Sequence, residues 1–417
     1  AKGGRVTPRR IAYLMSRFPN LSETFILREM IALRDLGWEI DIYPIIRQHP
    51  PVIHSEVQPW LPRVRHSPYL SFKVLAANLR ALFRSPRVYL RTALRVVREN
   101  ASDLNFFLRA LALFPKAVLA AEQIQVQGVQ HIHAHYASHP ALMAWIIHQF
   151  TGIPYSITVH AHDIFVRKAM LATKLADAHF IISISEFNRA YLSRLYGAWV
   201  EAKTHIIHCG VEPQRYPPHA EPPTSLPGLK ILSIGSLQPY KGQKYLIEAC
   251  ALLRAQQIPF ECQMIGAGEL HDELQAHIQS LGLENQVKLL GPQNQQAVAE
   301  YLAAANVYAQ PSIITPNGKM EGIPVSIMEA LASALPVVAS DLSGIPELVQ
   351  PSQTGQLVPP EDPQALAEAL TWVYHHPHEA HQMALRGRER VMAQFTLSTN
   401  AAALAAVFED TVQTRHS

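Results

Sequence analysis

The chain has 417 residues, of which 48% are hydrophobic and 17% charged, and its formal net charge is +3. This length exceeds one ordinary hydrophobic core and favours two domains of roughly 200 residues each. The apolar content excludes a disordered chain. The small net charge gives no reason to expect a nucleic-acid partner, and we expect none.

The cysteines and the apolar stretches indicate the cellular compartment of the protein. Cys209, Cys250 and Cys262 are odd in number and lack a zinc-site spacing, so we expect buried, reduced thiols. The basic start is followed by a strand-like run and not by the apolar core of a signal peptide. The longest apolar stretch, 106–121, is interrupted by charge and proline. We therefore expect a cytoplasmic protein without a transmembrane helix.

The first half of the chain alternates strand-like and helix-like patterns. A helix over 23–36, ended by Gly37, is flanked by the first two of six predicted strands. These strands cover 10–16, 39–46, 130–134, 155–159, 180–183 and 205–207. The alternation predicts a doubly wound parallel sheet within residues 1–208, an N-terminal Rossmann-like domain.

A proline-rich segment over 209–228 is typical of a semi-rigid linker. The strand and helix alternation then restarts, with strands at 230–234, 260–265 and 287–290 and helices at 242–256 and 269–281.

We expect a second Rossmann-like domain over 229–395 and a C-terminal helix over 396–417 that packs back toward the first domain. The fold class is therefore α/β, with two doubly wound Rossmann-like domains facing each other across an inter-domain cleft. Ligands of such folds bind beyond the carboxyl ends of the strands.

Two glutamates flank the start of a helix in the second half. Glu321 precedes the turn 322–324, and Glu329 follows about one turn inside the apolar helix. Free N–H groups at a helix start suit a phosphate, and a carboxylate can accept hydrogen bonds from ribose or sugar hydroxyls. A nucleotide sugar needs both kinds of group. As an isolated pair, the two residues would more simply be a capping acid and a solvated helix residue.

A second class of function rests on histidines. His131, His133 and His135 alternate along a predicted strand and share one face, as the metal ligands of a hydrolase do. The sequence offers no later set of His and Asp ligands after successive strands, and a two-domain repeat is not a single barrel. A metal-dependent hydrolase is therefore the alternative. An NAD-dependent oxidoreductase is excluded, because residues 11–19 contain no glycine.

Nearly the whole chain resembles the family-4 retaining glycosyltransferases with the GT-B fold, especially the exopolysaccharide and colanic-acid-type branch. Short motifs spread over both halves carry the resemblance. They are residues 13–19, 22–25, 133–135, 158–163, 183–186, 235–242, 266–268, 320–332, 336–338 and 346–347.

The resemblance implies that the N-terminal domain is the acceptor side and that the C-terminal domain binds the nucleotide sugar. It also assigns roles to the two glutamates and to other residues. It implies that Glu321 lies beside the donor sugar, that Glu329 holds the nucleotide ribose, and that His160 contacts the transferred sugar. Lys241, which precedes a glycine, would contact the donor diphosphate, where a cation is needed because the leaving group gains negative charge. The family usually carries an arginine in this loop, at the position of Ser236.

Further residues complete the expected site. Donor contacts come from backbone and small side chains at Gly235, Ser236, Gly266, Gly268, Val325 and Ser326. Acceptor-side candidates are Ser16, Asn20, Ser22 and Asp163. No Asp-x-Asp pair stands where a metal-dependent transferase requires one, so we expect neither a metal nor a cofactor.

A basic stretch follows the first strand pair. Six arginines recur at steps of three and four, on one helical face, with Ser85-Pro86 starting a second helix. They are Arg80, Arg84, Arg87, Arg91, Arg95 and Arg98. Such a basic amphipathic region can lie on anionic lipid, where a lipid-linked acceptor would sit, or can be the solvated face of ordinary core helices.

The resemblance, taken over the whole chain, implies a hexosyltransferase that uses a nucleotide-diphosphate sugar and a glycan or lipid-linked acceptor.

Overall fold

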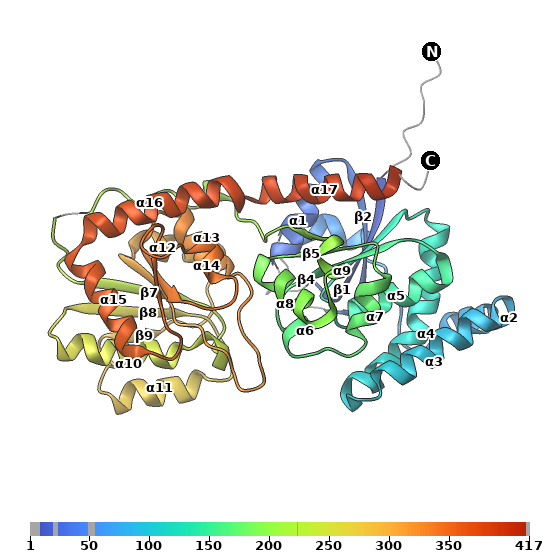
Figure 1. The fold of residues 1–417 in the computed structure, drawn as a ribbon, viewed down its shortest axis with the longest axis horizontal. Helices are drawn as coiled ribbons and strands as arrows, with labels where there is room; N and C mark the ends of the chain where they lie inside the picture. The colour runs from blue at the N-terminus through green and yellow to red at the C-terminus, as the bar shows by residue number, and fades with distance from the viewer. Residues whose placement is uncertain (1–8, 20–23, 49–54, 223, 414–417) are drawn as a thin grey trace, which may run out of the picture. The chain divides into compact units, whose positions relative to one another are not determined.

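The computed structural model describes residues 9–19, 24–48, 55–222 and 224–413. The chain divides into two compact units (Figure 1). Unit 1 comprises residues 1–184, 188–207 and 401–417, and unit 2 comprises residues 185–187 and 208–400. Each unit has its own sheet and its own hydrophobic core.

Unit 1 is built on a parallel sheet of six strands in the order β2-β1-β3-β4-β5-β6. The strands are β1 (Arg9–Phe18), β2 (Trp38–Arg47), β3 (His131–His135), β4 (Tyr155–Val159), β5 (Phe180–Ser183) and β6 (Thr204–Ile206). The three central strands β3, β4 and β5 are buried at every residue, as expected for a parallel sheet with helices on both faces. The predicted doubly wound α/β fold is therefore confirmed for this half.

Helices connect these strands. They are α1 (Thr24–Asp35), the 3-10 helix η1 (Ser55–Arg63), α2 (Phe72–Arg84), α3 (Pro86–Asn100), α4 (Leu104–Val126), α5 (His139–Thr151), α6 (His162–Phe165), α7 (Leu171–Asp177), α8 (Glu186–Tyr196) and α9 (Trp199–Ala202). The Ser71 hydroxyl accepts from the Val74 N–H, and the Asp103 carboxylate accepts from the Phe106 N–H. These two caps begin α2 and α4.

The C-terminal helix α17 (Leu397–Gln413) contributes to the core of unit 1. Its residues Leu404 and Phe408 are at most 1% exposed and belong to the same apolar cluster as Trp38 of β2. The Phe408 ring lies 5.5 Å from the Trp38 ring and 5.2 Å from the His133 ring. The last helix of the chain therefore covers the face of the sheet that carries the histidines of β3.

Among the described residues, α4 alone is long and apolar enough to cross a membrane. Of its apolar window, 56% is buried inside the protein, and the helix packs against α2, α3 and α5. A buried core helix passes the same test of length and composition.

Unit 2 repeats the architecture with strand order β12-β11-β10-β7-β8-β9. Its strands are β7 (Leu229–Ile234), β8 (Phe260–Ile265), β9 (Val287–Leu289), β10 (Val307–Gln310), β11 (Val337–Ser340) and β12 (Gln356–Val358). Its helices include the 3-10 turns η2 (Pro213–Arg215) and η3 (Pro239–Lys241). They continue with α10 (Gln243–Ala255), α11 (His271–Ser280), α12 (Gln295–Ala304), α13 (Val325–Ala332), α14 (Ile345–Leu348), α15 (Pro363–His375) and α16 (Pro377–Gln394). All three cysteines are free.

The proline-rich segment 209–228, predicted as a semi-rigid linker between the domains, belongs to unit 2. There Val211 and Tyr216 are at most 1% exposed and Val211 bridges to Thr396. The prolines stiffen the segment, but its few apolar side chains bury themselves in the core of unit 2. The second unit therefore begins at His208 and not at residue 229.

Candidate functional site

Two of the predicted donor-side residues meet in unit 2. Lys241 ends η3, and its Nζ forms an ion pair with Oε1 of Glu321, which precedes α13. The two side chains are only 12% and 9% exposed. Burial by itself lowers the pKa of Lys241, but the neighbouring Glu321 carboxylate outweighs it and raises the pKa above its ordinary value. Lys241 therefore stays charged at neutral pH.

Buried polar side chains of β10 hold Glu321 in place. Gln310 Nε2 lies 3.3 Å from Glu321 Oε1 and 3.0 Å from the Ser312 hydroxyl. The Tyr308 hydroxyl donates to Gln310 Oε1 at 2.7 Å, which fixes the orientation of the amide. The sequence motifs did not point to Tyr308, Gln310 or Ser312. Gln310 and Ser312 are polar residues at the end of a buried strand, and this pattern could have indicated a site in the sequence.

Glu329 lies inside the first part of α13 and is also engaged. The Tyr216 hydroxyl, from the proline-rich segment, donates to Glu329 Oε1 at 2.7 Å. At the start of the same helix the Ile327 N–H donates to the Pro324 carbonyl, whereas the Val325 and Ser326 N–H groups have no acceptor within the described part of the chain. The helix start therefore offers free backbone donors at Val325 and Ser326, as the sequence predicts.

The glycines of this region let two loops pack closely. A Cβ at Gly266 would lie 1.9 Å from the Gly235 carbonyl oxygen, and one at Gly268 would lie 2.3 Å from that of Leu237. A Cβ at Gly235 would come within 3.2 Å of the Lys241 side chain. These glycines therefore allow the two loops to pack closely and leave room for the Lys241 side chain. Their close approach to a phosphate stays a prediction.

A second lysine lies beside Lys241. Lys319 Nζ donates to Gln238 Oε1 at 2.6 Å and sits 4.5 Å from the centre of the Tyr240 ring, over which Lys241 Nζ lies at 5.2 Å. No sequence motif pointed to Lys319. Ser236, where the family usually has an arginine, accepts a hydrogen bond from Gln243 through its carbonyl. Lys319 therefore brings a second positive charge to the loop that has lost the arginine.

In unit 1, His160 follows β4 and is buried. Its Nε2 lies 3.4 Å from Nδ1 of His135, and its ring is 4.4 Å from the Tyr136 ring. Burial first, and then the nearby His135 and His162, lower the pKa of His160 well below its ordinary value. His160 is therefore neutral at physiological pH and can exchange hydrogen bonds without carrying charge.

A chain of hydrogen bonds continues from His160 into the unit. His135 Nε2 lies 3.1 Å from Glu29 Oε1, and the Tyr13 hydroxyl donates to the same oxygen at 2.7 Å. Glu29 comes from α1 and did not stand out in the sequence, because nothing in its spacing links it to β3. The chain fixes the ring of His135 and, through it, that of His160.

The predicted acceptor-side residues do not lie together in one described site. Asp163 is fully buried, and its carboxylate accepts from the backbone N–H groups of Ala137, His160 and Ala161. It therefore holds the loop after β4 together, and its oxygens are occupied. Ser16 lines a cavity in unit 1. Asn20 and Ser22 lie outside the described residues.

Of the β3 histidines near Glu29, His133 has both of its ring nitrogens hydrogen-bonded within the protein. Glu29, His133 and His135 are close enough to hold a metal ion. However, His133 bonds Ser156 through Nδ1 and Thr158 through Nε2, at 2.7 and 2.9 Å. A histidine with both nitrogens engaged has none left for a metal, so the geometry does not support the hydrolase alternative.

The arginine-rich region forms two helices, and two of its six arginines are paired. Arg80 of α2 pairs with Glu122, and Arg95 of α3 pairs with Glu99. The expected single basic face is therefore incomplete. The remaining four have no ion-pair partner among the described residues, and they are Arg84, Arg87, Arg91 and Arg98.

Two family profiles match most of the chain. "Glycosyltransferase Family 4" matches residues 85–215, and "Glycosyl transferases group 1" matches residues 220–390. The amylovoran biosynthesis glycosyltransferase AmsK of Erwinia amylovora is 28% identical over 93% of this chain and 96% of its own length. The putative colanic acid biosynthesis glycosyltransferase WcaL of Salmonella typhimurium is 26% identical with the same coverage.

Solved structures show the same fold. Anabaena HepE in complex with UDP-glucose has a TM-score of 0.70 at 19% identity, covering 96% of this chain and 99% of that one. A sucrose-phosphate synthase of Thermosynechococcus elongatus has a TM-score of 0.69 at 22% identity, covering 96% and 98%. The two parallel sheets with flanking helices are thus the GT-B fold.

The buried histidines predict acid sensitivity. Burial first, and then His179, lower the pKa of His131 to about 3. Below about pH 6.5 the unfolded chain binds a proton that the folded chain does not, so the stability present above this pH is lost as the pH falls. Urea unfolding should show a loss of about 1.4 kcal/mol per pH unit for each such histidine between pH 6 and pH 4. Replacing His131→Phe should remove one histidine's share of this slope, whereas His375→Gln, at an exposed site, should not change it. An unchanged slope in His131→Phe would contradict the assignment.

Proposed function

Because the chain belongs to the group 1 and family 4 glycosyltransferases, we propose that it transfers a hexosyl unit from a nucleotide-diphosphate sugar with retention of configuration. The acceptor is a hydroxyl of a glycan or of a lipid-linked sugar in exopolysaccharide or cell-surface glycan synthesis. The observation that carries the proposal is the buried pair of Lys241 and Glu321 beside the start of α13. Relatives named for amylovoran and colanic acid synthesis support it.

The donor half of the reaction follows from the charges of this site. The donor diphosphate binds to Lys241 and to the free N–H groups of Val325 and Ser326, which stabilise the negative charge that grows as the glycosidic bond breaks. Glu321 lies beside the sugar, and Glu329 accepts from the ribose. The neutral His160 hydrogen-bonds the transferred sugar, and the leaving phosphate takes the acceptor's proton. The reaction in this proposal uses no metal.

The two glutamates should separate kinetically. Glu321→Ala should lower kcat about 100-fold, because it removes a group that acts as charge develops, whereas Glu329→Ala should raise the donor KM about tenfold. Thermal-shift screening against UDP-, GDP-, ADP- and dTDP-sugars first identifies the donor. Steady-state assays in EDTA then measure both constants. Glu284→Ala, at an exposed site, is the control, and normal turnover in Glu321→Ala would refute its role.

We further propose that Lys319 replaces the arginine that the family usually has at the position of Ser236. The ammonium groups of Lys319 and Lys241 lie 4.5 and 5.2 Å from the centre of the Tyr240 ring, so both charges are near the same loop. Lys319 is half-buried and donates to the neutral amide of Gln238, so its charge is available to a diphosphate.

Lys319→Ala should therefore weaken binding of the donor diphosphate about tenfold, the usual effect of losing one charge-assisted hydrogen bond. Calorimetric titration with UDP and with uridine tests this, because only UDP carries the diphosphate. Lys230→Ala, an exposed lysine of the same unit, is the matched control. Equal UDP affinity in Lys319→Ala and Lys230→Ala would exclude the role.

We also propose that the protein is cytoplasmic and sits peripherally on the inner face of the membrane through α2 and α3. Large apolar side chains of these helices and of the segment before them are exposed, with Leu70 at 89%, Phe72 at 84% and Phe83 at 81%. The unpaired arginines Arg84 and Arg87 lie beside Phe83 in sequence. Exposed apolar groups next to unpaired cations favour an anionic lipid surface over plain solvation.

Flotation with vesicles tests the membrane surface. The wild-type protein should float with vesicles containing phosphatidylglycerol, less so as salt rises, and not with pure phosphatidylcholine. A variant with Arg84, Arg87, Arg91 and Arg98 changed to Gln should lose most of this binding, whereas Arg194→Gln should keep it. Equal flotation of the fourfold variant and the wild type would rule the surface out.

A further inference from the structure

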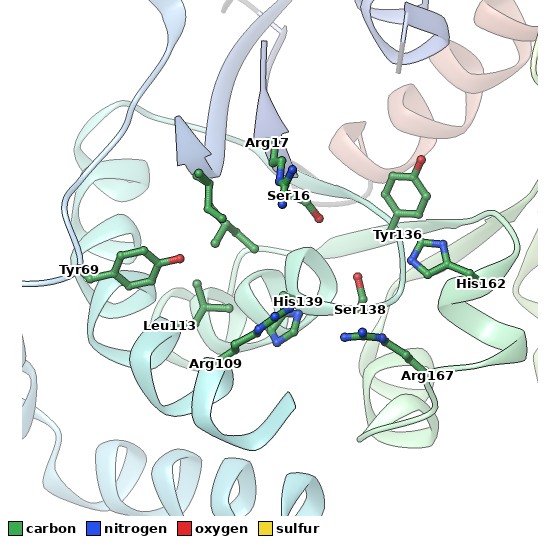
Figure 2. Close-up of a pocket in the computed structure, with 12 residues that line it drawn as sticks. Ser16, Arg17, Tyr69, Arg109, Leu113, Tyr136, Ser138, His139, His162 and Arg167 are labelled. Atoms are coloured by element: carbon green, nitrogen blue, oxygen red, sulfur yellow. The ribbon is translucent and has the colours of Figure 1, made fainter. Parts of the chain in front are cut away.

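Unit 1 contains a cavity of about 580 Å³ that has no part in the donor site of unit 2 (Figure 2). It lies where β1 and β2 end and where the chain leaves β3 and β4, at the carboxyl edge of the sheet. Ser16, Tyr69, Tyr136 and Ser138 give it hydroxyl groups. The volume is that of a pocket for a small ligand and holds one or two sugar rings with a charged group.

Three arginines enter this cavity from three different elements. Arg17 comes from β1, Arg109 from α4 and Arg167 from the segment after α6 (Figure 2). None of the three has an ion-pair partner within residues 9–19, 24–48, 55–222 and 224–413, and no Asp or Glu lines the cavity there. Unpaired guanidinium groups on a concave surface focus a positive potential into it.

Two buried lysines donate to backbone carbonyls of residues that line or adjoin the cavity. Lys116 Nζ donates to the carbonyl of Ile45, which lines the cavity, and lies 4.8 Å from the Tyr69 ring. Lys174 Nζ donates to the carbonyl of Ala137. Burial lowers the pKa of Lys116 to about 8 and that of Lys174 to about 7, the latter in spite of Asp163. Each lysine is thus held by neutral carbonyls, and an anion nearby would favour its charged form.

An unsatisfied polar atom lies at the same place. His139 lines the cavity and stacks on Phe106 at 3.9 Å between ring centres, and its Nε2 is buried without a hydrogen-bond partner. Burial first, and then the cations Lys174, Arg109 and Arg167, lower the pKa of this histidine to about 4. A buried nitrogen without a partner is costly, and a ligand in the cavity would supply the partner.

We propose that this cavity is the acceptor subsite and that its three arginines recognise an oxyanion carried by the acceptor, either a phosphate or a sugar carboxylate. The inference rests on the proposed function and gives its acceptor a chemical class. Guanidinium groups match both oxyanions with paired hydrogen bonds. Three arginines exceed what a single carboxylate needs, which favours a diphosphate.

The surroundings of the cavity also favour a phosphate on a lipid. Leu70 follows Tyr69 directly and is 89% exposed, and Leu108 precedes Arg109 and is 56% exposed. Apolar side chains next to cavity-lining residues suit the hydrocarbon chain of a lipid-linked sugar better than a soluble glycan.

Protection from phenylglyoxal, which modifies arginine, tests the subsite on the full chain. Inorganic pyrophosphate, glucuronate and glucose are added at equal concentrations, and peptide mass spectrometry gives the modification rates of Arg109 and Arg167. Pyrophosphate should slow both rates at least threefold, whereas the rate of Arg194, exposed on α8, should not change. In the variant Arg109→Ala, protection of Arg167 should weaken, whereas Arg194→Ala should leave it intact.

The protection pattern distinguishes a phosphate from a sugar carboxylate as the oxyanion of the acceptor. Protection by pyrophosphate alone supports the phosphate, and protection by glucuronate alone supports a sugar carboxylate in place of it. Equal rates with and without both anions, or equal protection by glucose, would overturn the subsite. Donor binding is read separately by the thermal shift with nucleotide sugars. A protein that shows anion protection but binds no nucleotide sugar would contradict the proposed transferase reaction and leave the cavity an anion site.

Discussion

The ion pair between Lys241 and Glu321 is the interaction on which the donor site depends. Removing two charges from water costs several kcal/mol for each ion, and their attraction offsets this only if the remaining atoms are also hydrogen-bonded. The structure meets that condition on the side of Glu321 through Gln310, whose amide Tyr308 orients. On the side of Lys241, Gly235 leaves room for the lysine stem. The glycine beside Lys241 and the polar residues at the end of β10 thus both support the same buried ion pair.

Much of the fold could be predicted from the sequence, because buried parallel strands are continuous apolar runs. The strand predicted over 10–16 is Arg9–Phe18, and the helix predicted over 242–256 is Gln243–Ala255. The segment 209–228 was misjudged because its prolines are a local signal, whereas the burial of Tyr216 against α13 is a long-range one. No local pattern shows that Tyr216 will bond Glu329, more than a hundred residues later.

In the candidate site, too, some residues could be predicted from sequence motifs and others only from the structure. The motif pointed to Glu321, Glu329 and Lys241, and the structure pairs the first with the third. Lys319 escaped notice because a lone lysine in a loop looks like any surface lysine until the Tyr240 ring is placed beside it. The three arginines of the cavity are separated by 92 and 58 residues in sequence, and only the meeting of β1, α4 and the loop after α6 brings them together.

The two sites also differ in how their charge is balanced. In unit 2, Lys241 already has a carboxylate partner, so the diphosphate that we propose as its ligand would share this lysine with Glu321. The additional cation of Lys319 and the free N–H groups of α13 then become important. In unit 1 the arginines have no such partner within the described residues, so an anion would neutralise them without displacing anything. A site whose cations already have carboxylate partners can bind its ligand and still release a product of higher negative charge. A site whose cations have no partner gains most binding free energy from a ligand whose charge does not change. A donor diphosphate becomes more negative in the reaction, and an oxyanion on the acceptor keeps its charge, so each site suits the substrate proposed for it.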